Sequence, residues 1–210
     1  MFRSSRSARR RRRAWLATIY LIPAALFGAT QANAQVLQRN LAELTTLAPD
    51  IVVGTVAAIR DGFADGVPYS EITVDLSRTV KGGLRGTYTF RQFGLQSPKP
   101  GPGGQRNVML TPAGWPTYAV GEEVMLFLYH PAKRTGLRTT VGLDQGKFSI
   151  RDGRIRNAHG NAGLFDRMQL PTPRGSRSGA LPAAGAAADA DAFIDLVDQA
   201  VRERWFEEAK

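Results

Sequence analysis

Few side chains in this sequence could carry catalysis or bind a metal. The two histidines are His130, which follows an apolar segment, and His159, which lies in a stretch rich in small residues. Brought together in space, two histidines could act as a general base or as metal ligands. The sequence has no His-Glu-x-x-His, no Gly-x-Ser-x-Gly and no phosphate-binding loop. We therefore expect structural roles for both histidines, no catalytic centre, and no metal or cofactor.

Acidic residues gather in one short segment that could suggest calcium. Asp61 and Asp65 are each followed by a glycine. Calcium loops of the EF-hand type span twelve residues and close with a glutamate, and this segment does not match that spacing. Aspartate and glycine are also common in turns, so we expect this segment to form a turn-rich loop.

Three aromatic residues are the best candidates for contact with a partner. Phe63 lies in the predicted loop 60–68, and Trp115 and Tyr118 lie in a long segment, 94–120, that is dense in glycine and proline. Long loops inside compact domains are often functional. Because interfaces favour aromatic residues, we predict that these three anchor a protein partner.

Two alternatives remain open for the aromatic residues of the long segment. Trp115 and Tyr118 have the basic residues Lys99 and Arg106 nearby in the sequence, and such pairs can stack on bases or sugars. Equally, the two rings could fold the segment back over the core, because large aromatic side chains usually bury most of their surface.

The strong positive charge belongs mainly to the N-terminal segment. The chain of 210 residues carries a formal charge of +10, but seven of its 28 basic residues lie in residues 1–34, which leaves 21 basic against 18 acidic residues. Nucleic-acid binding needs a basic stripe, so we do not expect nucleic acid as the main partner. The chain has no cysteine, which excludes disulfides, thiolate metal sites and cysteine nucleophiles.

Residues 1–34 have the three parts of a secretory signal. An arginine-rich head ends at Arg13, an apolar stretch runs from Ala14 to Phe27, and Ala32-Asn33-Ala34 is a small-x-small cleavage pattern. We predict a secreted or periplasmic bacterial protein that is cleaved after Ala34 and keeps no membrane span. The paired arginines leave a twin-arginine export signal as an alternative, and an uncleaved anchor is the other alternative.

The remaining chain predicts a mainly β domain. An amphipathic helix is expected over 36–47, stopped by Pro49, and a strand buried on both faces over 49–58, in which Gly54 marks a bend, a bulge or a close backbone approach. Further strands are expected at 69–80, 87–93, 122–129, 137–143, 147–151 and 154–156.

The end of the chain predicts a hairpin, a linker and a helix. Asp152-Gly153 between two alternating segments is a strong hairpin signal. The domain is expected to end near residue 158. Residues 159–188 are rich in glycine, alanine and proline and predict a flexible linker. Residues 189–208 predict an amphipathic helix, which we expect to dock on its own domain; a partner is the alternative.

The order of these segments resembles a known family. The leading helix, the strand Ala48–Val56, the motif Val80-Lys81-Gly82 and the strand Gly121–Leu128 resemble the OB-fold modules of tissue inhibitors of metalloproteinases and netrin C-terminal domains. They look still more like a group of bacterial secreted proteins with the same pattern. The resemblance covers Leu41 to Ala158. It implies a small OB-like β-barrel of five or more strands with a short N-terminal helix and a C-terminal amphipathic helix.

Because no catalytic motif is present, we predict a non-catalytic binding module that engages an extracytoplasmic protein. The resemblance alone suggests a metalloprotease as one class of partner. Inhibitors of this family are held by disulfides and chelate the protease zinc through an N-terminal cysteine, whereas the predicted mature chain begins Gln35-Val36. Their inhibitory mechanism therefore does not carry over. The alternative is a small-ligand binder for oligosaccharide or nucleic acid in the groove of the barrel.

Overall fold

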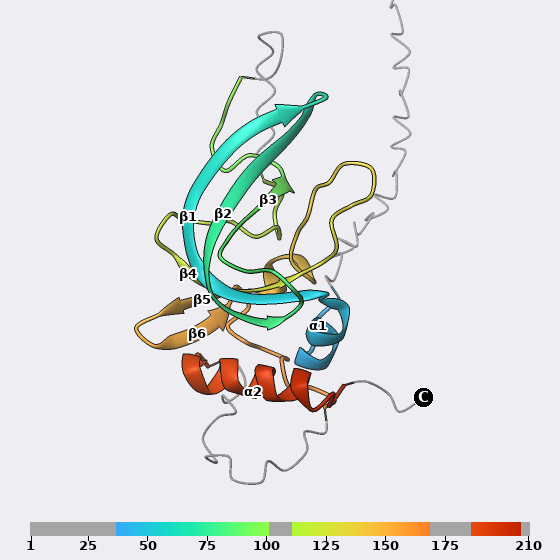
Figure 1. Cartoon of the computed structure of the whole chain (residues 1–210), viewed down its shortest axis with the longest axis vertical. Helices are drawn as coiled ribbons and strands as arrows, with labels where there is room; N and C mark the ends of the chain where they lie inside the picture. Colours follow the sequence, from blue (N-terminus) through green and yellow to red (C-terminus); the bar gives the residue numbers. More distant parts are fainter. Residues whose placement is uncertain (1–36, 101–110, 169–185, 207–210) are drawn as a thin grey trace, which may run out of the picture. The chain divides into compact units, whose positions relative to one another are not determined.

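The computed structural model describes residues 37–100, 111–168 and 186–206, and every structural statement refers to this part of the chain (Figure 1). The predicted signal peptide, 1–34, and residues 169–185 of the predicted linker lie outside it. The elements are α1 (Leu41–Leu47), β1 (Asp50–Ala64), β2 (Val67–Lys81), β3 (Thr87–Phe93), β4 (Glu123–Leu128), η2 (Leu143–Gly146), β5 (Lys147–Arg151), β6 (Arg154–Asn157), β7 (Ala188–Asp189) and α2 (Ala190–Arg202). No helix in the described ranges is long and apolar enough to cross a membrane.

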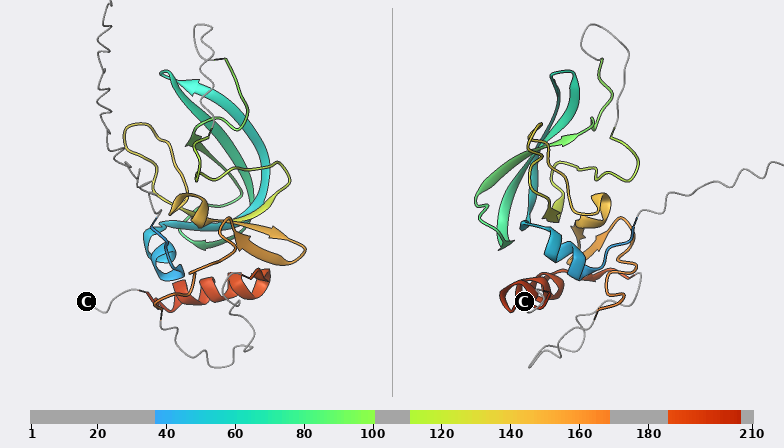
Figure 2. Two further views of the ribbon diagram at one scale, coloured as in Figure 1. Left: turned by 180° about the vertical axis from the view of Figure 1, so that it is seen from behind. Right: turned by 90° about the vertical axis from the view of Figure 1, so that its right-hand side faces the viewer.

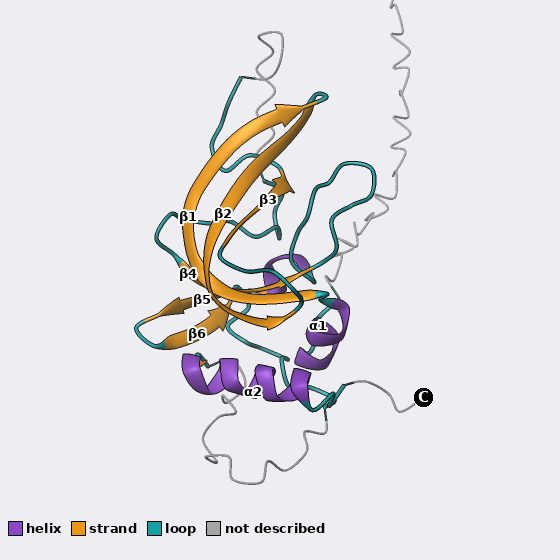
Figure 3. Cartoon of the chain, viewed as in Figure 1, coloured by secondary structure: helices purple, strands orange, loops and turns teal. Residues whose placement is uncertain are grey.

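The strands form one antiparallel sheet in the order β3-β2-β1-β4-β5-β6-β7. The mainly β class, the short N-terminal helix and the C-terminal helix are confirmed (Figure 3). The expected closed barrel is not found, because β3 and β7 lie at opposite edges of the sheet and do not pair. The sheet continues past β5 into β6 and β7, and no described strand returns from there to β3.

The first half of β1 is buried on both faces, as predicted. Ile51 and Val53 face a helix-side core, and Val52 and Val56 face a loop-side core on the opposite face. Gly54 lies at an irregularity in the pairing with β2, and a Cβ built there would lie 2.3 Å from the carbonyl oxygen of Asp75. Glycine is therefore required by the close approach of the two backbones.

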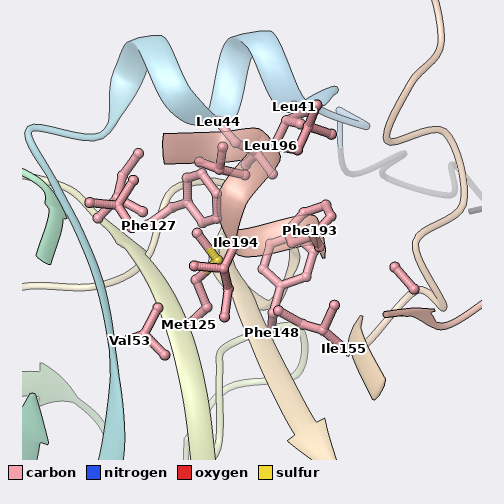
Figure 4. Packing of buried hydrophobic residues seen from close by; sticks show 14 of the residues in the cluster. Leu41, Leu44, Val53, Met125, Phe127, Phe148, Ile155, Phe193, Ile194 and Leu196 are labelled. Carbon is pink, nitrogen blue, oxygen red and sulfur yellow. The ribbon is translucent and has the colours of Figure 1, made fainter. Parts of the chain in front are cut away.

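The helix-side core joins the sheet to both helices (Figure 4). Phe148 lies between Phe127 and Phe193, with ring centroids 5.5 and 5.3 Å away. The stripe of α2 faces this core, so the helix docks on its own domain. Figure 2 shows α1 and α2 side by side in both views. The core consists mainly of Leu41, Leu44, Ile51, Val53, Met125, Phe127, Phe148, Ile155, Leu164, Phe193, Ile194, Leu196 and Val197.

The loop-side core lies on the opposite face of β1 and β4. Its side chains come from the first four strands and from one residue of the long segment, Tyr118. It consists of Val52, Val56, Ile72, Val74, Phe90, Tyr118, Val124, Leu126 and Leu128. Tyr118 therefore packs its part of the long segment against this face of the sheet, whereas both helices pack against the other face.

The predicted loop over 60–68 is wrong. β1 continues to Ala64 and turns at Asp65-Gly66, whose φ values are 50° and 77°, so that 15-residue strands flank a two-residue turn. The pairing with β2 keeps the intervening Asp61 and Gly62 in regular strand positions. Composition alone suggested a loop, but cross-strand pairing overrides the weak strand propensity of aspartate and glycine.

The strand predicted over 137–143 is replaced by an irregular segment with ladder-like contacts. Thr140 forms an isolated bridge with Leu128 of β4, and the N–H of Val141 donates to the Phe127 carbonyl at 2.7 Å. On its other side, the Arg138 N–H donates to the Arg91 carbonyl of β3 at 2.7 Å. The segment therefore lies between the end of β4 and the free edge of β3.

A buried arginine ties this segment to the sheet. The Arg138 side chain is 3% exposed and forms an ion pair with Asp50. It also donates to the hydroxyl of Tyr88 at 2.6 Å and to the carbonyl of Tyr129. One side chain thus connects the starts of β1 and β3 to the end of β4, and we call these contacts the Arg138 clasp.

The first ten residues of the predicted linker pack against the core. Leu164 is 1% exposed, and its carbonyl accepts a hydrogen bond of 2.8 Å from the N–H of Leu41. Asn161 is buried as well, and its side chain bonds to the backbone of Asn157. Leu164, Phe165 and Met168 are the apolar residues that pack against the helix-side core, and the small residues of the predicted linker lack such side chains.

Gly54→Ala should destabilise the chain by about 2 kcal/mol, because the added methyl group would force β1 and β2 apart. Gly83→Ala is the matched control, since a Cβ there meets nothing within 4 Å. We expect the control to change stability by less than about 0.5 kcal/mol. Urea unfolding followed by circular dichroism measures both. An equal loss in the two variants would contradict the close-approach explanation.

Candidate functional site

Tyr118 is a core residue rather than a partner contact. Its side chain is 7% exposed and packs edge-on against Phe90 at 6.0 Å between ring centroids. Burial, together with the charge of Glu122, raises the pKa of the Tyr118 hydroxyl above its usual value. The hydroxyl has no hydrogen-bond partner among the described residues. This outcome corresponds to the alternative in which the long segment folds back over the core.

Trp115 lies half-buried at the rim of the sheet. Its ring is 5.7 Å from that of Phe93, at the end of β3. The carbonyl of the next residue, Pro116, accepts a 2.8 Å hydrogen bond from the buried side chain of Gln92. These contacts hold the segment against β3 and leave part of the indole accessible.

Phe63 does not join the other two aromatic residues. It pairs with Pro68, whereas Phe93, which Trp115 contacts, pairs with Tyr69. Successive residues of a strand point to opposite faces, so Phe63 and Phe93 lie on different faces of the β1–β2–β3 sheet. Phe63 is half-buried. The three aromatic residues predicted as anchors therefore do not form one cluster. Trp115, which is half-buried like Phe63, is the aromatic residue of the long segment that keeps part of its ring accessible.

A groove of about 950 Å³ lies between residues 115–122 and the β5–β6 hairpin. Trp115 and Tyr118 form part of one wall. The floor is one face of the hairpin, because Ser149 pairs with Arg156 and Arg151 pairs with Arg154. The alternate residues of these strands face the helix-side core. One hairpin therefore has an apolar face that anchors it and a polar face that lines the groove, which we call the basic groove.

Three arginines supply positive charge to this groove, whose lining also includes Glu122 and Asp144, paired with Lys147 and His159, and the exposed Asp152. Arg151, Arg154 and Arg156 are all exposed and share the polar face of the hairpin. None of them forms an ion pair with a described acidic residue, and Arg154 donates to the backbone carbonyl of Ala187. Guanidinium groups bind carboxylates, phosphates and sulfates in a bidentate manner. The face can therefore receive an anionic group.

A buried ion pair supports the wall of the groove. The Glu122 carboxylate accepts from Lys147 Nζ at 2.7 Å, from Ser149 Oγ at 2.6 Å and from the Ala119 N–H at 3.2 Å. Burial raises the pKa of Glu122, but the hydrogen bonds from Lys147 and Ser149 and the lysine charge outweigh it and lower the pKa. Lys147 Nζ also lies 5.1 Å from the centre of the Tyr118 ring.

The polar groups around the groove do not form a nucleophile and base. Ser149 Oγ is hydrogen-bonded to Glu122, whose lowered pKa makes it a weak base. The histidine at the neighbouring turn, His159, pairs with Asp144 at 2.9 Å and has no hydroxyl partner. Among the described residues, no three His, Cys, Asp or Glu side chains are grouped as metal ligands.

Sequence reasoning missed the three arginines, although the signal was present. The Asp152-Gly153 turn was predicted, and alternation on either side of a two-residue turn places Arg151 and Arg154 on one face together with Arg156. Their grouping follows from the hairpin alone. The position of Trp115 beside them depends on contacts of the long segment that no local pattern predicts.

The chain was compared with protein-family models, with curated proteins and with solved structures, and none of the three comparisons found a match.

Glu122→Gln should lower stability at neutral pH by about 2 kcal/mol, because it leaves Lys147 without its buried anionic partner. Since the folded pKa of Glu122 lies below the unfolded one, its contribution is present above the ordinary value of 4.5 and is lost as the pH falls below it. The variant should therefore lose less stability on acidification than the parent. Glu123→Gln, at the exposed neighbouring residue, is the control and should retain the parent's pH dependence. Thermal unfolding between pH 7 and pH 3 measures this difference.

Proposed function

We propose that this chain is a secreted or periplasmic bacterial binding module without catalytic activity, and that its basic groove holds an acidic segment of a protein partner. The observation that carries the proposal is the group formed by Arg151, Arg154 and Arg156, three exposed cations on one face of the β5–β6 hairpin. Trp115 adds an aromatic surface in the same groove. Arginine and tryptophan are the residue types most enriched among the residues that dominate binding energies.

Export is supported by the N-terminal sequence. Residues 1–34 combine the arginine-rich head, the apolar stretch and the Ala-x-Ala pattern of a signal peptide. The resemblance to metalloproteinase inhibitors adds a protease as one class of partner. The groove adds a separate chemical requirement, namely that the contacted segment carry carboxylates.

We also infer an OB-like barrel for the first four strands together with residues 137–141. In this arrangement the spatial order is β1, β2, β3, the 137–141 segment and β4, and β4 pairs with β1. The Arg138–Arg91 backbone hydrogen bond and the Leu128–Thr140 bridge support it. OB folds are partly open barrels of five strands, so an irregular fifth member is compatible with the class.

A polyanionic ligand is the second candidate. The same arginines would pair with sulfate, phosphate or uronate groups, and Trp115 could stack on a sugar or a base. The near balance of 21 basic and 18 acidic residues after residue 34 favours a local site over a long polyanion, because it provides no extended basic stripe. An acidic peptide is therefore preferred to an oligosaccharide or a nucleic acid.

Binding is tested with a capped ten-residue peptide of alternating glutamate and valine. Replacing Arg151, Arg154 and Arg156 together by glutamine should weaken its binding about tenfold or more, at roughly 1 kcal/mol or less for each exposed pair. The control replaces the exposed Arg85, Lys133 and Arg134 by glutamine, an equal change of charge away from the groove. Isothermal titration calorimetry at fixed ionic strength gives both affinities.

Three outcomes would contradict the proposal. Equal weakening of peptide binding in the two triple variants would show that the peptide is attracted by the overall charge and not by the basic groove. Absence of peptide binding by a folded parent chain would remove the acidic-peptide function. Tighter binding of a sulfated oligosaccharide than of the peptide, lost in the groove variant alone, would favour the second candidate.

The inferred closure of the OB-like barrel by residues 137–141 is tested with Arg138→Ala. The change leaves Asp50 without its cation in a mostly buried position and should cost about 3 kcal/mol. It should also speed amide exchange of the Arg138 and Val141 N–H groups, which bond to β3 and β4. Arg134→Ala, an exposed arginine of the same loop, should leave stability and exchange unchanged. Unaltered exchange in Arg138→Ala would show that the clasp does not hold the segment.

A further inference from the structure

Among the described strands, none pairs with the second half of β1 on the side away from β2, so this half is an edge of the sheet. β1 pairs with β4 only from Asp50 to Thr55. Val56 still bonds to the backbone of Gly121 and Glu122, but from Ala57 to Ala64 no described strand lies on that side. Unpaired strand edges are templates for the addition of another strand.

The pairing with β2 determines which backbone groups face the open side. Phe63 lies opposite Pro68, which has no N–H, and the Pro68 carbonyl accepts from the Gly94 N–H on the other side of β2. Phe63 and Pro68 therefore form a non-hydrogen-bonded pair. By alternation, the N–H and C=O groups of Ile59, Asp61 and Phe63 all point away from β2.

One contact agrees with this assignment. The carbonyl of Asp61 accepts a 2.8 Å hydrogen bond from Lys99 Nζ, which comes from the open side. No described group bonds to the outward N–H and C=O of Ile59 and Phe63. Lys99 thus bonds to one carbonyl of the edge, and no described residue bonds to the flanking positions. Within the described part of the chain, an added strand would replace a single exposed hydrogen bond.

A groove of about 880 Å³ runs beside this edge and is lined by Ile59, Arg60, Asp61, Lys99 and the segment 117–120. Val120 is 65% exposed and offers an apolar contact on the far side. The basic groove is lined by Thr117, Tyr118 and Ala119 as well, so the two grooves adjoin across one short segment.

The charge of the edge groove suits the same ligand as the basic groove. Arg60 and Lys99 are cationic, whereas the carboxylate of Asp61 is engaged by Ser70 Oγ at 2.6 Å and by the N–H groups of Gln96 and Ser97 at 3.0 and 2.8 Å. An acidic side chain along the groove would therefore meet two cations, Arg60 and Lys99, beside a carboxylate whose oxygens already accept from three donors.

We propose that the acidic segment of the partner binds in extended form and adds as a strand to β1, pairing with the outward backbone groups of Ile59, Asp61 and Phe63. This inference rests on the proposed function, since it supplies the conformation and second contact surface of the same peptide. The backbone of β1 provides the pairing, and the arginines of the basic groove select for acidic side chains. Phe63 then contributes through its backbone rather than as an aromatic anchor.

The first test is residue-resolved amide exchange with the same glutamate–valine peptide, on the chain from Gln35 onward. In the free chain, the N–H groups of Ile59, Asp61 and Phe63 should exchange fast, and those of Arg60 and Gly62 slowly, because the latter bond to β2. Added peptide should slow exchange at Ile59, Asp61 and Phe63 and leave Arg60 and Gly62 unchanged. Only an added strand produces this alternation.

The second test separates backbone from side chain at one position. Phe63→Pro removes an outward N–H and keeps every bond to β2, because prolines are accepted on strand edges. It should weaken peptide binding about fivefold to tenfold. Phe63→Ala retains the N–H and should bind within about twofold of the parent. Circular dichroism confirms that both variants are folded.

The outcomes distinguish this inference from the proposed function. If the peptide binds and the groove arginines are needed, but exchange at Ile59, Asp61 and Phe63 does not change, the strand addition is wrong and the basic groove stands. If a folded chain binds no peptide, the proposed function fails. Concentration-dependent protection of the three amides without peptide would assign the edge to a second copy of this chain and overturn the peptide assignment.

Discussion

The double burial of β1 is the constraint on which the rest of the structure depends. Its first half separates two hydrophobic cores, so Ile51 and Val53 pack toward the helices while Val52 and Val56 pack toward the long segment. Both faces must be apolar, and Gly54 must lack a side chain where β2 comes close. Beyond Val56 this constraint ends, and the same strand becomes an edge. The proposed interaction surface therefore begins where β1 is no longer buried on both faces.

Two buried ion pairs hold the segments that lack regular structure. The Arg138–Asp50 pair fixes residues 137–141 between β3 and β4, and the Lys147–Glu122 pair fixes residues 115–122 over the loop-side core. In both cases additional hydrogen bonds satisfy the remaining polar atoms, which is the condition under which buried charges are tolerated. Side chains here provide the connections that a continuous ladder provides elsewhere in the sheet.

Periodicity predicted most of the strands, and composition misled where pairing decided the outcome. Strand β3 and the Asp152-Gly153 hairpin follow from alternation and turn chemistry. The extension of β1 through Asp61 and Gly62 was not predicted, although Asp65-Gly66 carries the same turn signal as Asp152-Gly153. Tyr118 was predicted as a contact residue because interfaces favour aromatic residues, with burial over the core as the alternative. Its burial depends on long-range packing that the sequence does not show. The basic groove was missed for a similar reason, since its two walls are far apart in the sequence.

The position of α2 in the helix-side core has a consequence for the order of folding events. The ring of Phe193 covers Phe148, which in turn covers Phe127, so this core remains open until residues 190–202 are present. A chain that is synthesised or exported with its N-terminus first therefore exposes these rings until residues 190–202 follow. Such exposed apolar surface is what chaperones recognise. The helix-side core is therefore complete only when residues 190–202 have joined it.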